Sequence, residues 1–293
     1  MIMEGGLAQV LRDMARNAVR LSMGEGEGPV IGRFGGAPDV PEGFGWPWFV
    51  TDTYVDDEVK PRPLSFLAQF DCAALAPLDG DGLLPHEGVL SFFYEVVSQR
   101  WGYDPEDGGC ARVFWFPDKA ALRPAAFPED LGDCCRFPEL PIRGWSETEY
   151  PSYEEFAAAL DLLESCVKES ARPWEAFEEI RKAVRGGEAA PPPWHRLLGW
   201  PDIIQGNMTQ ECELVSRGYS TGNGLEGIPE EIWREIEETS PDNWRLLLQL
   251  DNGIGTGDFS LEFGDSGSIY FYIRKEDLAA RRFDRVWLIL QCC

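Results

Sequence analysis

A repeated strand motif limits the folds that are open to this 293-residue chain. The mostly apolar segment PLSFLAQFD (63–71) ends in Gln-Phe-Asp, and WRLLLQLD (244–251) ends in the related Gln-Leu-Asp. Each is followed by a glycine and an aromatic-rich segment, GVLSFFYE (88–95) and GSIYFYI (267–273), 19 and 18 positions after its glutamine. Short apolar runs between turn residues are typical of buried strands. The sequence therefore predicts two similar sets of strands.

A third motif repeats in the same order. Gly-Ala-Pro-Asp (36–39) precedes the first set of strands, and Gly-Trp-Pro-Asp (199–202) precedes the second. We expect a β-rich, single α+β domain over residues 24–291, built from two similar half-motifs with pseudo-twofold character. Its expected parts are a first half at 30–96, a helical insertion at 97–195 and a second half at 196–291.

The first 23 residues are predicted to form an amphipathic helix. Apolar side chains recur at helical spacing, and Arg12, Arg16 and Arg20 lie four apart on the other face. The segment lacks the continuous apolar stretch and the cleavage site of a secretory signal. Since no run of about eighteen apolar residues occurs, we expect no membrane span and a cytoplasmic protein whose 8 cysteines are mostly free thiols.

The charge of the chain limits its partners. Asp and Glu number 51 against 26 Lys and Arg, which gives a formal net charge of −25. Such a surface repels a phosphate backbone, so a nucleic-acid partner is not expected. A basic protein partner fits this charge, although an acidic surface also serves solubility alone.

Seven segments in order resemble the YwqG-like family: GGAPDVP, WPW, PLSFLAQFD, GVLSFFYE, LLGWPDIIQ, LLLQLD and GDSGSIYFYI. The resemblance spans roughly residues 30–290 and is absent from 96–195. That family is a bacterial domain family of unknown function. The resemblance implies a mixed α+β fold built largely of strands, and it brings no established activity, cofactor or catalytic residue.

The glutamines are the most informative candidate site residues. Gln69, Gln205 and Gln249 each lie in or beside an apolar segment, where an amide is costly unless it is hydrogen-bonded. Asp71 and Asp251 each follow a glutamine by two positions, which places each pair on one face of its strand. Either each glutamine bridges backbone groups between the two half-sheets and each aspartate caps a turn, or these groups line a cleft shared by the two halves. The candidates for the walls of that pocket are Trp46, Trp48 and Asp265.

Motifs for common catalytic and cofactor sites are absent from the sequence. The glycines of NGIGTG (252–257) precede another strand instead of a helix, which argues against nucleotide binding. His86 and His195 are the only histidines, and no G-x-S-x-G segment accompanies them. DGDG (79–82) begins like a calcium loop but continues with Leu, Leu and Pro. We therefore predict neither a metal site nor a cofactor.

These observations favour a non-enzymatic interaction protein with an acidic surface. It would bind a basic protein as an inhibitor or an immunity-type factor. The alternative is an enzyme or small-ligand-binding protein with a site at the junction of the two halves. A thiol-based sensor that uses Cys134–Cys135 or Cys292–Cys293 is a third hypothesis. The sequence specifies neither the partner nor the oligomeric state.

Overall fold

The computed structural model describes residues 2–157, 172–188, 194–222, 224 and 227–293. Its main sheet has ten strands, β1 (Arg16–Met23), β2 (Val30–Phe34), β6 (Ser65–Asp71), β7 (Val89–Tyr94), β8 (Ala111–Phe116), β10 (Leu140–Glu149), β11 (Arg196–Leu198), β12 (Trp244–Asp251), β15 (Ser268–Arg274) and β16 (Trp287–Gln291). Three two-stranded sheets pair β3 (Asp39–Val40) with β9 (Arg123–Pro124), β4 (Trp48–Thr53) with β5 (Asp56–Pro63), and β13 (Ile254–Thr256) with β14 (Phe259–Leu261). The α-helices are α1 (Ile2–Asp13), α2 (Cys72–Leu75), α3 (Tyr153–Ala157), α5 (Pro173–Arg185), α6 (Met208–Ser216), α7 (Glu230–Asn243) and α8 (Lys275–Ala279), and the 3₁₀ turns are η1 (Pro105–Asp107), η2 (Lys119–Ala121), η3 (Asp133–Cys135) and η4 (Phe283–Arg285).

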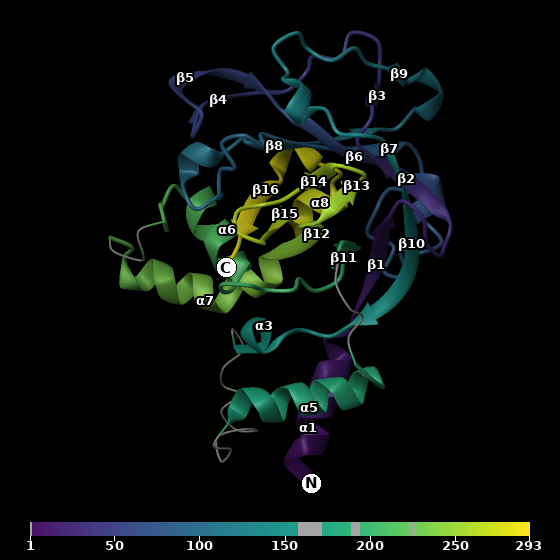
Figure 1. The fold of residues 1–293 in the computed structure, drawn as a ribbon. Helices are drawn as coiled ribbons and strands as arrows, with labels where there is room; N and C mark the ends of the chain where they lie inside the picture. The colour runs from purple at the N-terminus through teal and green to yellow at the C-terminus, as the bar shows by residue number, and fades with distance from the viewer. Residues whose placement is uncertain (1, 158–171, 189–193, 223, 225–226) are drawn as a thin grey trace.

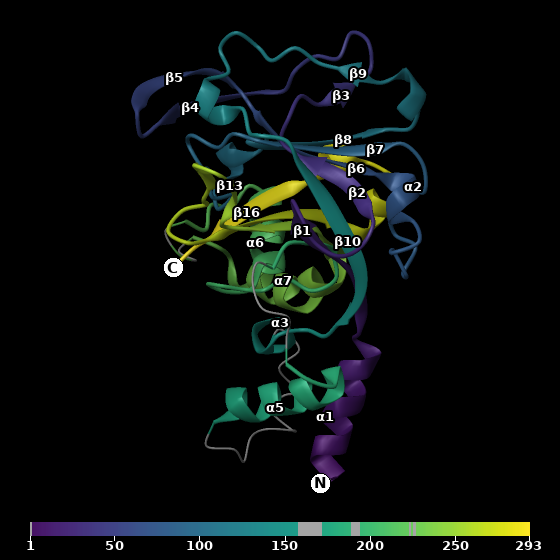
Figure 2. The same ribbon diagram turned by 45° about the vertical axis from the view of Figure 1, so that its right-hand side comes forward.

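Two strands from distant parts of the sequence meet in the middle of the main sheet. β1 and β10 pair antiparallel through eight residues, from Arg16 opposite Glu149 to Met23 opposite Ile142. Beyond β10 the order is β2, β6, β7 and β8, and beyond β1 it is β11, β12, β15 and β16. Figures 1 and 2 show the antiparallel sheet curving through this central pair, so that β6–β8 lie opposite β12, β15 and β16.

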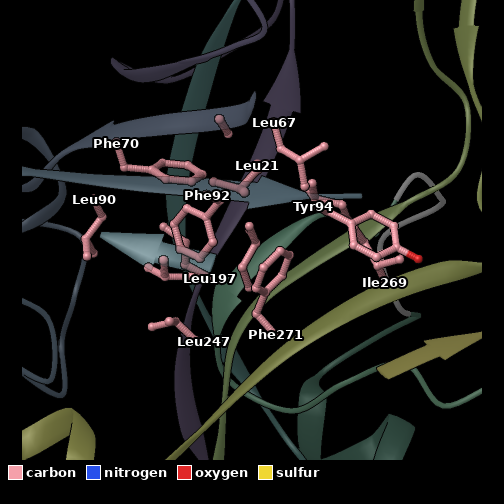
Figure 3. Close-up of a cluster of buried hydrophobic side chains, with 14 of the residues drawn as sticks. Leu21, Leu67, Phe70, Leu90, Phe92, Tyr94, Leu197, Leu247, Ile269 and Phe271 are labelled. Atoms are coloured by element: carbon pink, nitrogen blue, oxygen red, sulfur yellow. The ribbon is translucent and has the colours of Figure 1, made fainter. Parts of the chain in front are cut away.

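The inner face of the curved sheet encloses the main apolar core. Leu90, Phe92 and Tyr94 of β7 point inward, with the period of two that a strand requires. Phe92 meets Phe271 of β15 edge to face, with 5.2 Å between the ring centroids (Figure 3). Such a contact adds to the stabilisation from buried area, so it holds the two sides of the sheet together.

The outer faces of the sheet are covered as well, which explains why its strands have nearly continuous apolar sequences. On one side, Met208 of α6 packs against Tyr270 and Tyr272 of β15. On the other side, Phe44 packs against Phe93 of β7. Figure 1 shows α6 and α7 below β12, β15 and β16, and the segments with β3, β4, β5 and β9 above β6, β7 and β8.

The helix predicted over residues 1–23 ends at Asp13, so the prediction is wrong for the rest of that segment. Residues 16–23 form β1 because both edges of the strand find hydrogen-bonding partners, β10 on one side and β11 on the other. Val19 and Leu21 enter the core, while Arg20 points to the opposite face. Arg12 therefore lies on a helix and Arg20 on a strand, and the spacing of four residues between the arginines does not mark one helical face.

Residues 97–195, predicted to be a helical insertion between the two halves, also contain strands of the main sheet. They contain β8 and the central strand β10, and Ile142 of β10 is fully buried in the core. The sequence did not indicate this role because the pairing of β10 with β1 joins segments more than 100 residues apart.

The helical part of that segment agrees with the sequence where the structure describes it. The backbone N–H of Glu155 donates to Ser152 Oγ (3.3 Å) at the start of α3, which is half of a capping box. α5 begins at Pro173 and ends at Arg185, and the cap Gly186 has a φ of 85°, the left-handed conformation that glycine adopts readily. Leu160, Leu163 and Val167 have helical spacing in the sequence, and they lie outside the described residues.

Candidate functional site

Gln69 is buried in a polar network on the outer face of β6. Its Oε1 accepts hydrogen bonds from the Arg33 guanidinium (3.0 Å) and from the Asp39 backbone N–H (2.9 Å). Its Nε2 donates to the Asp39 carbonyl (2.6 Å) and to Ser91 Oγ (2.8 Å). Arg33 also pairs with the Asp39 carboxylate at 2.8 Å and donates to the Ala37 carbonyl at 2.6 Å. The amide has its partners, which is the condition for burying it.

Gln249 holds the corresponding place on β12, in a similar but less complete network. Its Oε1 accepts from the Asp202 backbone N–H (3.0 Å), and its buried Nε2 has no partner among the described residues. Arg196 donates to the Trp200 carbonyl (2.7 Å) and pairs with both Asp202 and Glu149. Since Glu149 belongs to β10, this network is linked to the central strand pair.

The two networks share the sequence signature Arg-x-x-Gly-x-Pro-Asp, at 33–39 and at 196–202. In both, the arginine binds the carbonyl four residues later and the aspartate six residues later. Both turns pass through left-handed backbone at the third residue, where Gly35 has a φ of 62° and Leu198 a φ of 59°. Neither arginine was among the predicted site residues, although each stands three residues before the glycine of the repeated motif.

The structure does not bring the two glutamines into a common cleft. β6 and β12 are separated in the sheet by β2, β10, β1 and β11. Gln69 and Gln249 extend from the outer face, because their neighbours Phe70 and Leu250 point into the core. Each glutamine is thus hydrogen-bonded within its own half, so the prediction that it bridges the two half-sheets is wrong.

Asp71 and Asp251 bind the backbone of neighbouring segments. Asp71 Oδ1 accepts from a backbone N–H in the first turn of α2 (3.0 Å), and its Oδ2 pairs with Lys119. Asp251 Oδ2 accepts from the Trp194 backbone N–H at 3.1 Å. A cavity of about 360 Å³ lies beside Gln69 and Asp71. The basic residues that line it, Arg33 and Lys119, are already ion-paired with Asp39 and Asp71.

The remaining candidates lie in separate places. Gln205 is exposed outside any strand, and its backbone N–H donates to Gln291 Oε1 (3.1 Å). Trp46 donates its Nε1 hydrogen to the carbonyl that precedes β6 (2.9 Å). Asp265 is exposed in the turn before β15, and Trp48 is 41% exposed on β4. These four residues therefore do not form the walls of one pocket.

His195 is buried, and its imidazole serves as a hydrogen-bond acceptor. Its Nδ1 accepts from the Asp251 backbone N–H at 2.9 Å, which requires a neutral ring that carries its hydrogen on Nε2. Burial lowers the pKa of His195 to about 4, because the charged form loses its hydration. His86 is exposed. The buried histidine is therefore neutral near pH 7 and holds the start of β11 against the end of β12.

The described cysteines are free thiols. The Sγ atoms of Cys134 and Cys135 are 3.7 Å apart, which is a hydrogen-bond contact between two thiols and not a disulfide. Burial raises the pKa of Cys135 to about 12, so its reactive thiolate form is scarce at neutral pH. This environment does not favour a redox sensor at the first cysteine pair.

A groove of about 530 Å³ opens between the β4–β5 hairpin and two distant loops. Phe49, Val50 and Val59 line it from the hairpin, and the segment 100–107 lines it from the other side. Arg100 joins these walls, since its Nε and Nη2 donate to Thr51 Oγ1 (3.0 and 2.7 Å). In Figures 1 and 2, the hairpin projects beyond the main sheet at the upper left.

The groove has an apolar and acidic rim. Val50, Tyr54, Val55 and Val59 are 60–81% exposed, and Trp101 across the groove is 40% exposed. The segments 48–63 and 100–107 together carry seven acidic and three basic side chains. Burial raises the pKa of Tyr54 and of Asp107, whose Oδ2 accepts from the Gly102 N–H (2.9 Å).

Most of the chain matches a known sequence family. A family described as a domain of unknown function (DUF1963) matches residues 32–292. The chain belongs to the DUF1963 family. The match runs from within β2 to just after β16, so the central strand β1 and the helix α1 precede it. No curated protein matches the chain.

Three further observations bear on the predictions for this DUF1963 chain. Within residues 2–157, 172–188, 194–222, 224 and 227–293, no three His, Cys, Asp or Glu side chains are grouped to hold a metal ion. In the same residues, no helix has both the length and the apolar character needed to cross a bilayer. The glycines of NGIGTG belong to the β13–β14 hairpin, so a strand follows them as predicted.

Replacement of the two glutamines by leucine should have unequal effects on the free energy of unfolding. Gln69→Leu leaves Arg33, Ser91 and the Asp39 backbone without their partner, so we expect a loss of about 3 kcal/mol. Gln249→Leu removes one hydrogen bond and one unpartnered buried amide, so we expect a loss of about 1 kcal/mol. Urea denaturation measures both variants, and equal losses would contradict the difference between the networks.

His195 should make the stability depend on pH between 6.5 and 4. In this window the unfolded chain protonates its histidine while the folded chain keeps His195 neutral, so the free energy of unfolding decreases as the pH falls. His195→Gln removes this term and keeps a hydrogen-bond acceptor. The stability difference between wild type and variant should decrease by about 3 kcal/mol from pH 6.5 to 4. A difference that stays constant would show that His195 titrates as an exposed histidine does.

Proposed function

We propose that this DUF1963 protein is a non-enzymatic interaction module that binds a basic protein through the β4–β5 hairpin and the groove beside it. The position of the exposed apolar side chains carries this proposal. Of ten large apolar residues that are exposed in the described chain, five lie on this hairpin, and a sixth, Trp101, lines the groove. Exposed apolar residues gathered in one place on a surface mark sites of interaction.

The charges around these side chains specify the chemistry of the partner. Asp52 and Asp56 are paired with basic residues, whereas Asp57, Asp104 and Glu106 have no ion pair among the described residues. Unpaired carboxylates at the rim attract basic side chains and accelerate their association. The fitting partner therefore presents an apolar centre surrounded by lysine or arginine.

The groove is better suited to binding than to catalysis. Thr51 Oγ1 accepts from Arg100, Asp107 accepts from a backbone N–H, and Asp104 accepts from Ser220 Oγ (2.9 Å). These groups hold the walls together, and they do not form a pair of nucleophile and base. The alternative enzyme or ligand site at the junction of the halves gains no support from Gln69 and Gln249, which belong to separate networks.

The proposal places the protein in the cytoplasm as an inhibitor or an immunity-type factor. Its support is the net charge of −25 together with the free thiols of the described cysteines. The seven ordered motifs further support a YwqG-like assignment within DUF1963. Recovery of the protein outside the cytoplasm in cell fractionation would contradict this part of the proposal.

An internal duplication is the second part of the proposal. It is supported by the two Arg-x-x-Gly-x-Pro-Asp turns and by the order of strands in the sheet. β2 and the glutamine strand β6 follow β10, as β11 and the glutamine strand β12 follow β1. Each half also has a register shift next to a buried leucine, Leu67 or Leu247, two residues before its glutamine. An alignment of DUF1963 members should contain the arginine in both turns. Members that retain it in only one turn would count against the duplication.

The hairpin proposal predicts that a charge change at two exposed valines strongly weakens binding. Val50→Lys with Val59→Lys removes apolar contact and repels a basic partner, and the fold should be retained because both side chains are exposed. The wild-type protein should capture a basic protein from a lysate of the source cells at low salt and release it at about 0.5 M salt. The affinity of this basic protein for the double variant should be about a hundredfold lower than for the wild type.

Trp174→Lys is the matched control, because Trp174 is 53% exposed on α5, away from the hairpin. This variant should capture the same partner as the wild type. Equal capture by the valine variant, or capture that persists at high salt, would contradict the proposed surface.

A further inference from the structure

A small cavity lies at the end of the sheet that faces α3. Its volume is about 210 Å³. It lies where β1 begins, β11 ends and β12 begins, and Arg16, Leu198 and Arg245 line it from these three strands. The loop with Asp81 and Leu83 closes another side. Since this space lies apart from the hairpin groove, it can be tested independently of the proposed function.

Arg16 differs from the other arginines at the centre of the fold. Arg20 and Arg196 each pair with Glu149, whereas Arg16 has neither an ion pair nor a side-chain hydrogen bond in the described structure. Its guanidinium is held by stacking, 3.2 Å above the ring centroid of Trp200. The N–H donors of a stacked arginine stay available at the edge of the guanidinium plane. Arg16 is thus positioned without an ion pair at contact distance, although the Glu155 carboxyl interacts with it electrostatically.

Arg245 adds a second positive charge to the same space. Its Nη1 donates to the Trp244 carbonyl at 2.8 Å, and its side chain lines the cavity with Arg16. Burial lowers the pKa of Arg16 to about 9, and repulsion between the two guanidinium groups contributes to the same shift. Asp81, the acidic residue in the lining, already accepts from the Asn17 backbone N–H (2.9 Å). An anion between the arginines would relieve this repulsion.

Two buried oxygen atoms that belong to neighbours of Arg16 have no hydrogen-bond partner among the described residues. They are the hydroxyl of Tyr272 and Oε1 of Glu155, and both residues interact electrostatically with Arg16. Burial of such groups without hydrogen bonds is costly, and an unpartnered group often indicates a missing ligand or water. Burial raises the pKa of Glu155 to about 7, so near neutral pH this carboxyl can carry a proton and donate it in a hydrogen bond.

We propose that the cavity binds a small oxyanion, a carboxylate or phosphate group, between Arg16 and Arg245. The planar guanidinium matches both anions with parallel N–H donors. The Tyr272 hydroxyl supplies a further donor. The volume of the cavity is below the range of about 300–1,000 Å³ that suits drug-sized ligands, so the ligand is a small anion or the acidic end of a short molecule.

Calorimetric titration of the full chain with sodium phosphate, and separately with sodium succinate, tests the proposal. Chloride keeps the ionic strength constant, and the comparison of the two titrations distinguishes phosphate from carboxylate. One of the two anions should bind with one site per chain and raise the melting temperature. No heat and no shift with either anion at tens of millimolar would overturn the proposal.

Arg16→Gln should weaken the binding by about tenfold to a hundredfold, because charge-assisted hydrogen bonds are lost. Arg234→Gln is the matched control, since Arg234 is exposed on α7 and pairs only with Glu230 among the described residues. This control should bind the anion as the wild type does. Unchanged affinity in Arg16→Gln would place the anion elsewhere and overturn the proposal.

Tyr272→Phe provides a test that does not depend on the folding of the arginine variant. It keeps the ring and removes a hydroxyl that has no partner, so the stability without anion should not decrease. The affinity for the anion should fall by about threefold to tenfold. A variant that binds the anion as the wild type does would show that Tyr272 does not face it, and would contradict the proposed geometry.

Discussion

The eight-residue ladder between β1 and β10 is the constraint on which the rest of the structure depends. Each strand pairs on its other edge with one half of the sheet, β1 with β11 and β10 with β2. The backbone groups of both strands are therefore satisfied on both sides. Without this ladder each half would have an open edge, and contacts such as Phe92 with Phe271 would be left to hold the two sides together.

Buried charges at this ladder restrict how the strands can be aligned. Arg20 of β1 lies 3.6 Å from both Glu147 and Glu149 of β10, and Arg196 of β11 shares Glu149. A shift of one residue would leave these charges buried without partners, at a cost of several kcal/mol. Arg16, at the end of the same ladder, has no such partner, which is why the neighbouring cavity is suited to an anion. The β4–β5 hairpin takes no part in the ladder, so its surface is free to serve binding.

Local sequence patterns predicted many of the elements but not how they associate. The strands at Gln69 and Gln249, the strand after NGIGTG and the helices within 97–195 follow from apolar periodicity and turn residues. The prediction was wrong at 16–23, where pairing with two neighbouring strands prevailed over a helical pattern. The role of β8 and β10 within residues 97–195 was not predicted, because a single sequence does not reveal which distant segment pairs with β10.

By itself, the sequence indicated the β-rich α+β class, the strands that contain Gln69 and Gln249 and the polar residues at their ends, because these depend on neighbours along the chain. The tertiary structure alone decided that Gln69 and Gln249 lie in separate networks, since their separation depends on the order of strands in the sheet. The tertiary structure also forms the two sites that are proposed for binding. The hairpin groove and the arginine cavity each combine segments far apart in the sequence, and only the long-range hydrogen bonds of the folded sheet bring them together.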